Sequence, residues 1–529
     1  MYKFSLQKIK TYIKYCYFFH KMLLTLSASK LYITIFNKPS PIINTILYQD
    51  IQNNGCVIIK LIQWLHTRHS KFCTTSNPDN SNNTNNTNNS NNTNNNFDNI
   101  YNNIYEKCTT HSTEYSNQLF KQEFSADFND KIEIYPEYEI KSGSIAQVYK
   151  ARFRNTGQDV AIKITHPELY EQTVFPYIYY RIYNMLTTKI PLFKNYRIPF
   201  ELSEFFDSFT KQMNMRNEAT NLKYFYKEYQ SNPYIVIPKP IAWSNNILIM
   251  EYIEAIEFTQ IENKISDYTK YKIIMLLSLF LKDTMCLHDY YHADLHGGNW
   301  KVVLAQTSNP SIVIYDFGFC IEKSNDDKIS MQNIQKSLET NNIRKLAENI
   351  YKFIHYNPES ISQTEFIEVV LNTTKNIEYN LYSNELLTFT TNYFITKKYI
   401  FKSQMLDMLI TLLLVNNNFK KYLYKHNVDK EYLIDDRSTT IYNNERLQNL
   451  KSQIMNYINF CKTNKCFDKL VDYLIEYTNE IEENIDQSIN RGFEQYTKRI
   501  SPTNTPTTTN TTNTTNTTNT TNTTINLEI

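Results

Sequence analysis

The side chains that phosphoryl transfer requires occur in this 529-residue chain in a consistent order. The reaction needs a cation on the α- and β-phosphates, oxygen ligands for Mg²⁺ and a carboxylate beside the nucleophile. Lys163 ends the apolar segment that begins at Val160 and could supply the cation from a rigid strand. Asp294 and Asn299 have the spacing of a catalytic loop, and Asp316 opens an Asp-Phe-Gly triplet 17 residues after Asn299. We expect Asp294 to serve the nucleophile, and Asn299 and Asp316 to bind the metal.

Glu218 is the expected ion-pair partner of Lys163. Leu222 and Phe225 follow Glu218 at helical spacing, within a pattern that predicts one long helix over 201–229. One face of that helix would carry both the carboxylate and apolar packing. The alternative is that Glu218 is an acid on a solvated helix surface. The presence of the other motif residues in the same chain favours the ion pair.

Glycine usage marks the predicted nucleotide-binding segments. The chain has only seven glycines, where about 37 would be average for its length. Such a chain keeps glycine where a side chain is least tolerable, at positive φ or where the backbone approaches a ligand. We predict that adenine meets the backbone of Glu251 and Tyr252, at the end of an apolar strand. The phosphates should lie against the loop made of Ile140, Lys141, Ser142, Gly143, Ser144, Ile145, Ala146, Gln147 and Val148.

The elements that must position these residues fall into two groups. Period-two patterns and turn residues predict strands at 132–135, 146–153, 159–165, 235–243 and 247–252. Beyond them we expect a helix at 266–288, a hairpin of 300–304 with 311–315, and helix throughout 332–495. A small β-rich N-lobe followed by a large helical C-lobe is an α+β, protein-kinase-like bilobal fold.

Two low-complexity tracts divide the chain. Residues 77–99 are almost entirely Asn, Thr and Ser, and residues 502–524 repeat Thr-Asn-Thr. Neither tract can bury apolar surface, so both are expected to be disordered. The predicted organisation is a targeting segment at 1–49, an N-terminal extension at 50–75, a disordered linker at 76–130, the N-lobe at 131–252, the C-lobe at 253–500 and a disordered tail at 501–529.

Composition narrows the functional classes. A net charge of +2 gives no electrostatic reason to expect nucleic-acid binding. The eight cysteines have no metal-ligand spacing, which is typical of scattered reduced thiols. Residues 1–49 contain seven lysines and no acid, the profile of an organelle presequence, although a basic surface helix is the alternative. No apolar run reaches the ~20 residues of a membrane-spanning helix.

The catalytic loop at 292–299 carries two further features. Ala293 stands where an arginine would contact an activation-loop phosphate, and no Ala-Pro-Glu follows Asp316. We therefore expect weak phosphorylation of generic protein substrates. His292 and His296 could bind a metal, but packing and hydrogen bonding within the loop are the favoured interpretation.

Several segments are similar to the UbiB family of atypical kinases, also called aarF-domain-containing kinases. They are Ser-Ile-Ala-Gln-Val-Tyr-Lys-Ala at 144–151, Arg-Asn-Glu-Ala-Thr-Asn-Leu at 216–222 and His-Ala-Asp-Leu-His-Gly-Gly-Asn at 292–299. Lys60-Leu-Ile-Gln63 resembles the family's KxGQ hallmark. The resemblance implies an N-terminal helical extension that packs over the active site, through Lys60 and Gln63, and disfavours phosphorylation of proteins in trans.

The chain departs from the family pattern at two places. Ile62 replaces the hallmark glycine, and Gln212-Met-Asn214 stands where the family has an acidic ExD motif. Asn214 removes a carboxylate that would otherwise pair with the KxGQ segment. The chain therefore resembles a divergent member.

The resemblance implies ATP and Mg²⁺ as cofactors, and kinase or ATPase activity in mitochondrial isoprenoid-lipid (coenzyme Q) metabolism. It also implies a lipid or isoprenoid-quinone-like ligand and peripheral membrane association, with no nucleic acid. A small-molecule phosphotransferase of the aminoglycoside or choline kinase type stays open, although such enzymes usually lack Phe-Gly after the metal-binding Asp. A non-catalytic nucleotide- or lipid-binding scaffold also stays open, although pseudokinases commonly lose part of the set that is complete here. The sequence does not name the substrate.

Overall fold

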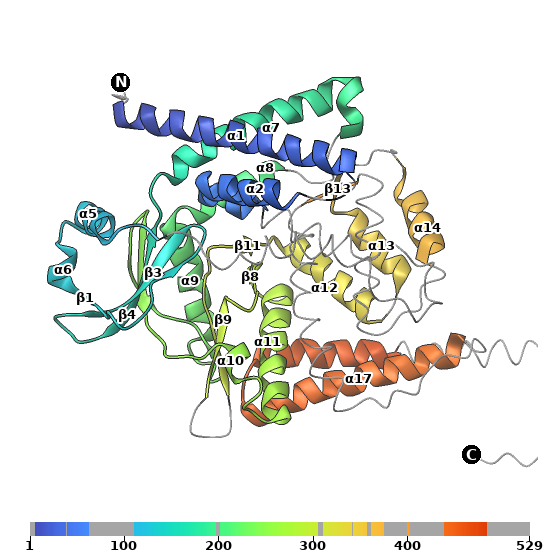
Figure 1. Cartoon of the computed structure of the whole chain (residues 1–529). Helices are drawn as coiled ribbons and strands as arrows, with labels where there is room; N and C mark the ends of the chain where they lie inside the picture. The colour runs from blue at the N-terminus through green and yellow to red at the C-terminus, as the bar shows by residue number, and fades with distance from the viewer. Residues whose placement is uncertain are drawn as a thin grey trace, which may run out of the picture.

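The computed structural model describes residues 6–62 except 37 and 39, 110–196, 202–304, 310–356 except 341, 361–374, 399–402 and 439–483. In this part of the chain a small lobe built on one sheet lies beside a larger, mainly helical lobe (Figure 1). The predicted α+β, kinase-like bilobal architecture is confirmed. Gln63, both low-complexity tracts and the tail at 501–529 lie outside the described residues.

The small lobe is an antiparallel sheet with the strand order β1-β3-β4-β7-β6, and β2 pairs with β3. Its strands are β1 (Ile132–Ile134), β2 (Lys141–Ser142), β3 (Ala146–Phe153), β4 (Asp159–Thr165), β6 (Pro240–Trp243) and β7 (Ile247–Glu251). Gly157 turns the chain between β3 and β4 at φ +69°, a conformation that only glycine adopts without strain. The strand predicted at 235–243 is divided into β5 (Ile235–Val236) and β6.

Side chains alternate between the two faces of the sheet along β4. Val160, Ile162 and Ile164 are fully buried on the outer face, beneath two short helices. Ala161 points to the opposite face and joins the core shared with the helical lobe. Lys163 lies two residues further along the strand and therefore on the same inner face as Ala161.

The two short helices correct the prediction of a disordered linker over 76–130. They are α5 (Thr113–Phe124) and α6 (Phe128–Lys131). Ser112 caps α5 by accepting a hydrogen bond from the N–H of Tyr115. Both helices are held against the sheet by buried apolar side chains, Leu119, Phe120 and Phe128. The prediction was wrong for 113–130 because the neighbouring Asn-rich tract obscured this short apolar pattern.

A break divides the helix predicted at 201–229 into α8 (Leu202–Gln212) and α9 (Met215–Tyr229). Asn214 has extended backbone angles, φ −101° and ψ 106°, and its side chain accepts a hydrogen bond from the N–H of Arg216. It is therefore the N-cap of α9, a position that asparagine favours. The break places Glu218 in the first turn of α9 and on its buried face.

The large lobe surrounds α11, which is mostly buried from Ile273 onward. Its helices are α10 (Phe258–Ile261), α11 (Asp267–Cys286), α12 (Asn325–Glu339), α13 (Ile343–Tyr351), α14 (Gln363–Thr374), α17 (Thr439–Asn464) and a helix at 468–483. Besides β5, its strands are β8 (Tyr290–His292), β9 (Trp300–Val303), β10 (Ser311–Ile314), β11 (Cys320–Glu322), β12 (Ile354–Tyr356) and β13 (Ile400–Phe401). The β9–β10 hairpin was predicted, whereas the antiparallel pair β12–β13 corrects the expectation of helix throughout 332–495.

An N-terminal helical layer lies along one side of the lobes (Figure 1). It consists of α1 (Leu6–Phe36), α2 (Pro41–Asn53) and a helix at 56–62, and α1 packs on α7 (Leu169–Lys189). After α7 comes a short 3₁₀ helix, η1 (Pro191–Tyr196). The helix at 56–62 packs on α8 through Val57, Phe205 and Phe209.

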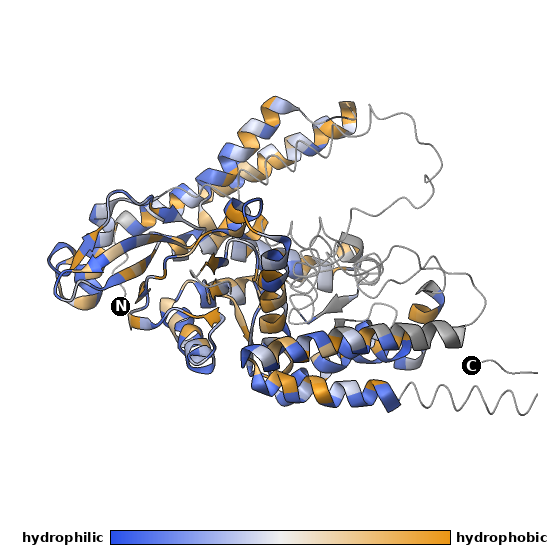
Figure 2. Ribbon diagram, turned by 90° about the horizontal axis from the view of Figure 1, so that it is seen from below, coloured by the Kyte–Doolittle hydropathy of each residue, from blue (hydrophilic) through white to orange (hydrophobic). Residues whose placement is uncertain are grey.

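None of the described helices has the length and apolar character needed to cross a membrane. In Figure 2 the helices carry hydrophilic and hydrophobic residues interspersed along their length.

Candidate active site

Lys163, Glu218 and Asp316 form one charged cluster between the lobes. The Nζ atom of Lys163 lies 2.8 Å from Oε1 of Glu218 and 3.1 Å from Oδ1 of Asp316. Strand β4 supplies the lysine, α9 supplies the glutamate, and the segment after β10 supplies the aspartate. Lys163 and Glu218 are buried, whereas the Asp316 side chain is 48% exposed. Glu218 and Asp316 lie 55 and 153 positions after Lys163 in the chain, and the fold brings all three together.

One cation between two carboxylates explains the electrostatics of the cluster. Burial raises the pKa of Glu218 to about 7, since Lys163 only partly offsets the desolvation and Asp316 adds to it. Partial desolvation between the lobes would also raise the pKa of Asp316, but the charges of Lys163 and Lys60 outweigh it and hold that pKa well below its usual range. Burial would lower the pKa of Lys163, yet the two carboxylates raise it instead. The lysine and Asp316 therefore stay charged, and Glu218 is the group poised to titrate.

Asp294 and Asn299 lie together in the loop between β8 and β9. The Asn299 Nδ2 atom donates a hydrogen bond of 2.8 Å to the Asp294 carbonyl, which leaves the amide oxygen for a ligand. Burial would raise the pKa of Asp294, but Lys60 and His296 outweigh this effect and lower it. His292 is buried, accepts from the Asp294 N–H and donates to the Tyr315 carbonyl. It holds the loop, in line with the favoured interpretation of its role.

The oxygen atoms of the two predicted metal ligands suit a hard cation. Asp316 has a left-handed φ of +55°, which is uncommon for a residue other than glycine. Backbone strain of this kind is found mainly at functional sites. A Cβ atom on Gly318 would come within 3.1 Å of the Asp316 carboxylate and 3.5 Å of the Glu218 carboxylate. Glycine at this position therefore leaves the space beside both carboxylates open. Mg²⁺ is usually bound by one or two carboxylates plus phosphates. The Asp316 carboxylate meets that description, and the Asn299 amide oxygen would add a neutral oxygen ligand.

The predicted phosphate loop is a tight turn between β2 and β3, closed by a 2.9 Å hydrogen bond from Gly143 N–H to the Ala146 carbonyl. Ser144 lies within this turn, and Ile145, Ala146 and Val148 pack toward the core shared with the helical lobe. The side chains of Ile140 and Gln147 do not face the site. Ile140 packs in the outer cluster, and Gln147 is buried against His111.

The backbone N–H groups at the predicted adenine contact are used within the sheet. The N–H groups of Glu251 and Tyr252 donate to the carbonyls of Lys239 and Asp159. A backbone N–H donor for adenine would therefore come from residues after Tyr252, whereas a contact of adenine with the carbonyls of Glu251 and Tyr252 stays a prediction.

Three contacts near the phosphate loop were not predicted from the sequence. Lys141 forms a 2.9 Å ion pair with Glu257, which joins the loop to the large lobe. His166 donates from Nε2 to the Gly143 carbonyl at 2.9 Å, and its backbone N–H donates to the Ile145 carbonyl at 2.8 Å. Only its position in the sequence could have pointed to His166, because it directly follows the strand that carries Lys163.

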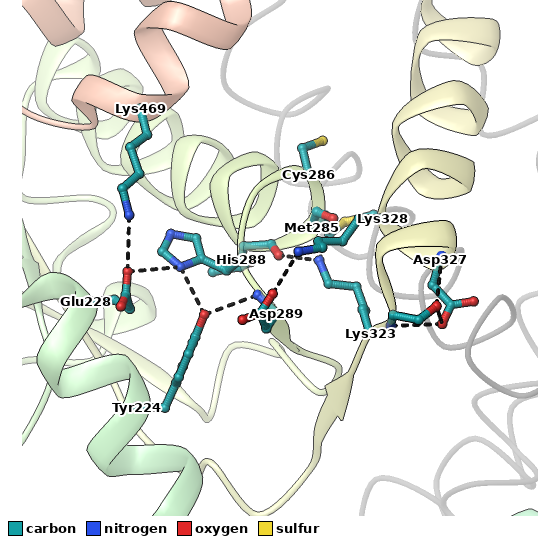
Figure 3. A network of polar contacts seen from close by, with 12 residues as sticks. Tyr224, Glu228, Met285, Cys286, His288, Asp289, Lys323, Asp327, Lys328 and Lys469 are labelled. Carbon is teal, nitrogen blue, oxygen red and sulfur yellow. Dashed lines mark hydrogen bonds and ion pairs between the residues drawn. The ribbon is translucent and has the colours of Figure 1, made fainter.

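The far end of α9 is tied to the large lobe by a polar network, shown in Figure 3. His288 lies 3.5 Å from Glu228 and 3.4 Å from the Tyr224 hydroxyl, which also accepts from the Asp289 N–H. Lys469, from the helix at 468–483, lies 3.5 Å from Glu228. This network fixes the helix that carries Glu218 against both the catalytic-loop side and the C-terminal helices.

The N-terminal extension reaches the site through Lys60. Its Nζ atom lies 3.5 Å from Oδ2 of Asp294, and neighbouring Leu61 belongs to the same apolar cluster as Ile145 of the phosphate loop. Lys60 therefore approaches Asp294, whereas Asn214 serves as a helix cap. Gln63 lies outside the described residues.

Residues 103–350 match the family model of the ABC1 atypical kinase-like domain. This range contains the whole N-lobe sheet together with the catalytic and Asp-Phe-Gly loops. These residues are similar to an ABC1 atypical kinase-like domain, and the curated relatives described next support the resemblance to the UbiB family. The N-terminal helical layer described above precedes the matched residues.

Two curated relatives carry the name probable protein kinase UbiB. The protein from Photobacterium profundum is 24% identical over 238 residues, which cover 43% of this chain and 40% of the relative. The protein from Photorhabdus laumondii subsp. laumondii is 24% identical over 218 residues, covering 40% and 39%. The aligned part of the chain thus spans about two fifths of the length of these relatives.

Two solved structures are also similar. The Rv3197–erythromycin complex from Mycobacterium tuberculosis is 17% identical with a TM-score of 0.38, covering 59% of this chain and 83% of that one. The Rio2 kinase–ADP/Mg²⁺-phosphoaspartate complex from Chaetomium thermophilum is 12% identical with a TM-score of 0.25, covering 53% and 74%. Because both scores are low, the fold assignment rests on the strand order and the family match.

Proposed function

We propose that this UbiB-type chain binds Mg–ATP between its lobes and acts as an atypical kinase or ATPase. The observation that carries the proposal is the Lys163–Glu218–Asp316 cluster, in which the lysine and the glutamate are buried, beside a loop that holds Asp294 and Asn299 together. Phosphoryl transfer depends mainly on positioning and charge neutralisation, and this cluster supplies both. The names of the relatives support a phosphotransferase at this general level.

The proposed roles follow from charge and placement. Asn299 and Asp316 would hold Mg²⁺, which when bound neutralises charge on the phosphates. Lys163 would contact the phosphates while Glu218 keeps its ammonium in place from the buried side. Asp294, held ionised by the nearby Lys60, would orient the attacking hydroxyl or water and accept its proton.

We also propose that generic proteins are poor substrates. Lys60 lies beside Asp294, where an acceptor hydroxyl would have to approach. Only three residues separate Asp316 from β11, and α12 begins at Asn325, so little chain is available for a substrate-docking segment. The contacts therefore favour a small acceptor or water over a folded protein.

The proposed setting is a mitochondrial membrane surface, in isoprenoid-lipid (coenzyme Q) metabolism. The N-terminal layer exposes large apolar side chains, among them Leu24 (72% exposed), Leu31 (61%) and Ile42 (73%). Residues 1–49 contain seven lysines and no acid; Lys14 and Lys21 pair with Glu168 and Asp50, and the net positive charge of the segment is of the kind that anionic lipids attract. These features support peripheral association with a membrane, and the isoprenoid-quinone-like ligand is proposed from the resemblance to the UbiB family.

A thermal-shift titration with Mg–ATP tests the proposal. Ligand at about 100 times its dissociation constant stabilises a protein by about 2.7 kcal/mol, so the wild-type melting temperature should rise. The rise should require Mg²⁺ and disappear in Asp316→Ala. Asp326→Ala, which removes an exposed carboxylate in the first turn of α12, should respond like wild type. An identical response of wild type and Asp316→Ala would refute the site assignment.

A further inference from the structure

One residue holds both ends of the phosphate-loop turn at 143–145. The His166 N–H donates to the Ile145 carbonyl at 2.8 Å, and the His166 Nε2 atom is 2.9 Å from the Gly143 carbonyl. Since a carbonyl can only accept, Nε2 must carry the proton of that second bond. His166 is buried and directly follows β4, the strand that presents Lys163. The loop and the lysine are therefore mechanically linked through three residues of chain.

The other ring nitrogen of His166 belongs to a chain of hydrogen bonds with one consistent direction. His166 Nδ1 lies 3.0 Å from His111 Nδ1, His111 Nε2 lies 3.0 Å from Ser116 Oγ, and Ser116 Oγ lies 2.8 Å from the Tyr149 hydroxyl. A neutral His166 with its proton on Nε2 accepts at Nδ1, so His111 must donate from its own Nδ1. His111 then accepts from Ser116, and Ser116 accepts from Tyr149.

Gln147 closes this network into a ring. Its amide nitrogen donates to the Tyr149 hydroxyl, and its amide oxygen accepts the N–H of His111 at 2.9 Å. Each polar atom in the ring thus has a partner of the right kind, and Gln147, Ser116 and Tyr149 are fully buried. A satisfied buried network of this sort fixes one arrangement of its members.

We propose that His166 is a positioning residue for the phosphate-binding loop, and that His111 with its buried partners fixes the tautomer in which His166 acts. The inference rests on the proposed function, because the loop matters only if phosphates bind there. In this arrangement His111, which precedes α5, influences the nucleotide site through His166 and does not contact the nucleotide. Gln147, placed in the loop by its sequence, acts from the outer face.

The surroundings of both histidines favour their neutral forms. Burial, and then the neighbouring His166, lower the pKa of His111 to about 4, and burial lowers the pKa of His166 despite its bond to Gly143. The groups that face the pair are Ser142, Tyr115, Ser116, Gln147 and Tyr149, and none of them carries a charge at neutral pH.

Two substitutions of the same chemistry but different reach test the proposal. His166→Gln places an amide nitrogen near the position of Nε2, from which it can donate to Gly143. His166→Asn ends near the position of Nδ1 and cannot reach it. The His166→Asn variant should bind Mg–ATP roughly tenfold more weakly, the effect of one lost hydrogen bond, and His166→Gln should recover most of that loss. Both should bind adenosine, which has no phosphate, as tightly as wild type.

The turnover number for ATP hydrolysis should change much less than the dissociation constant, because His166 touches no reacting atom. Equal Mg–ATP affinity of wild type and His166→Asn would overturn the inference, as would parallel losses for ATP and adenosine. Failure of wild type itself to bind Mg–ATP would overturn the proposed function, and this inference with it. The two failures are thus distinguishable from one set of titrations.

Discussion

The Glu218→Gln substitution should change how the stability of the protein depends on pH. Glutamine has nearly the shape of glutamate and can still accept a hydrogen bond from Lys163, but it cannot ionise. In wild type the carboxyl is 2% exposed and its pKa is raised to about 7, chiefly by burial. The substitution therefore removes one titration and little packing.

The size of the effect follows from linkage. A folded pKa of about 7 against an ordinary value of 4.5 is a difference of about 2.5 units, equivalent to about 3 kcal/mol. Because the folded pKa is raised, this stability is fully present below the unfolded pKa and is lost as the pH rises through 7. Most of the loss falls between pH 5 and pH 8. Glu218→Gln lacks this pH-dependent contribution, so its stability relative to wild type should grow by roughly 2–3 kcal/mol over that range.

Denaturant unfolding of both proteins at pH 5, 6, 7 and 8 measures the difference directly. Other titrating groups, including the histidines, are common to both proteins and cancel in the comparison. Glu133→Gln, which removes an exposed carboxyl on β1, should show a flat difference from wild type and serves as the control. Saturating Mg–ATP should shrink the effect, because a metal on Asp316 removes one cause of the raised pKa of Glu218.

A pH-independent difference between wild type and Glu218→Gln would refute this reasoning. It would mean that Lys163 fully compensates the burial of Glu218 and that the carboxyl stays ionised throughout the range. The cluster would then be a conventional ion pair, with Asp316 as the weaker partner of the lysine.

The remaining predictions concern the N-terminal segments. Lys60→Met removes the positive charge 3.5 Å from Asp294, so the pKa of Asp294 should rise and the acid limb of the pH–rate profile for ATP hydrolysis should move to higher pH. An unchanged acid limb would exclude Asp294 as the titrating base. Residues 1–49 fused to a fluorescent reporter should direct it to mitochondria, because they combine seven lysines with no acid. A uniformly cytosolic signal would count against targeting.

The placement of Lys163 and Glu218 could be predicted from the sequence because short-range periodicity decides it. In β4 side chains alternate between the two faces, which puts Lys163 on the same inner face as Ala161, and helical spacing puts Glu218 on the same side as the buried Leu222 and Phe225. The motif spacing also anticipated that Asp316 would meet them. These placements depend on the geometry of single strands and helices and on the order of the motifs along the chain.

The features that were missed depend on contacts between distant segments. Asn214 ends one helix pattern and begins another, yet each half has the same periodicity, so the sequence alone predicts a single helix. The bonds from His111 to His166 and Gln147 join residues 55 and 36 positions apart. No spacing rule predicts such pairs, because they arise only when α5 packs on the sheet.

The contacts that attach α1 to the rest of the protein indicate whether residues 1–49 can be removed after import. Glu168, strained at φ +62°, accepts from Thr11 at 3.2 Å, Lys14 at 3.0 Å and Tyr15 at 2.9 Å, so a single carboxylate of the N-lobe organises the first turns of α1. On α2, buried Asp50 accepts from Thr25 and pairs with Lys21. Removal of 1–49 as a conventional presequence would strip partners from both acids. Targeting and folding are compatible only if the segment is retained, so protein recovered from mitochondria should still contain α1. N-terminal sequencing decides this, and a mature chain that starts near residue 50 would show that the docked arrangement exists only before import.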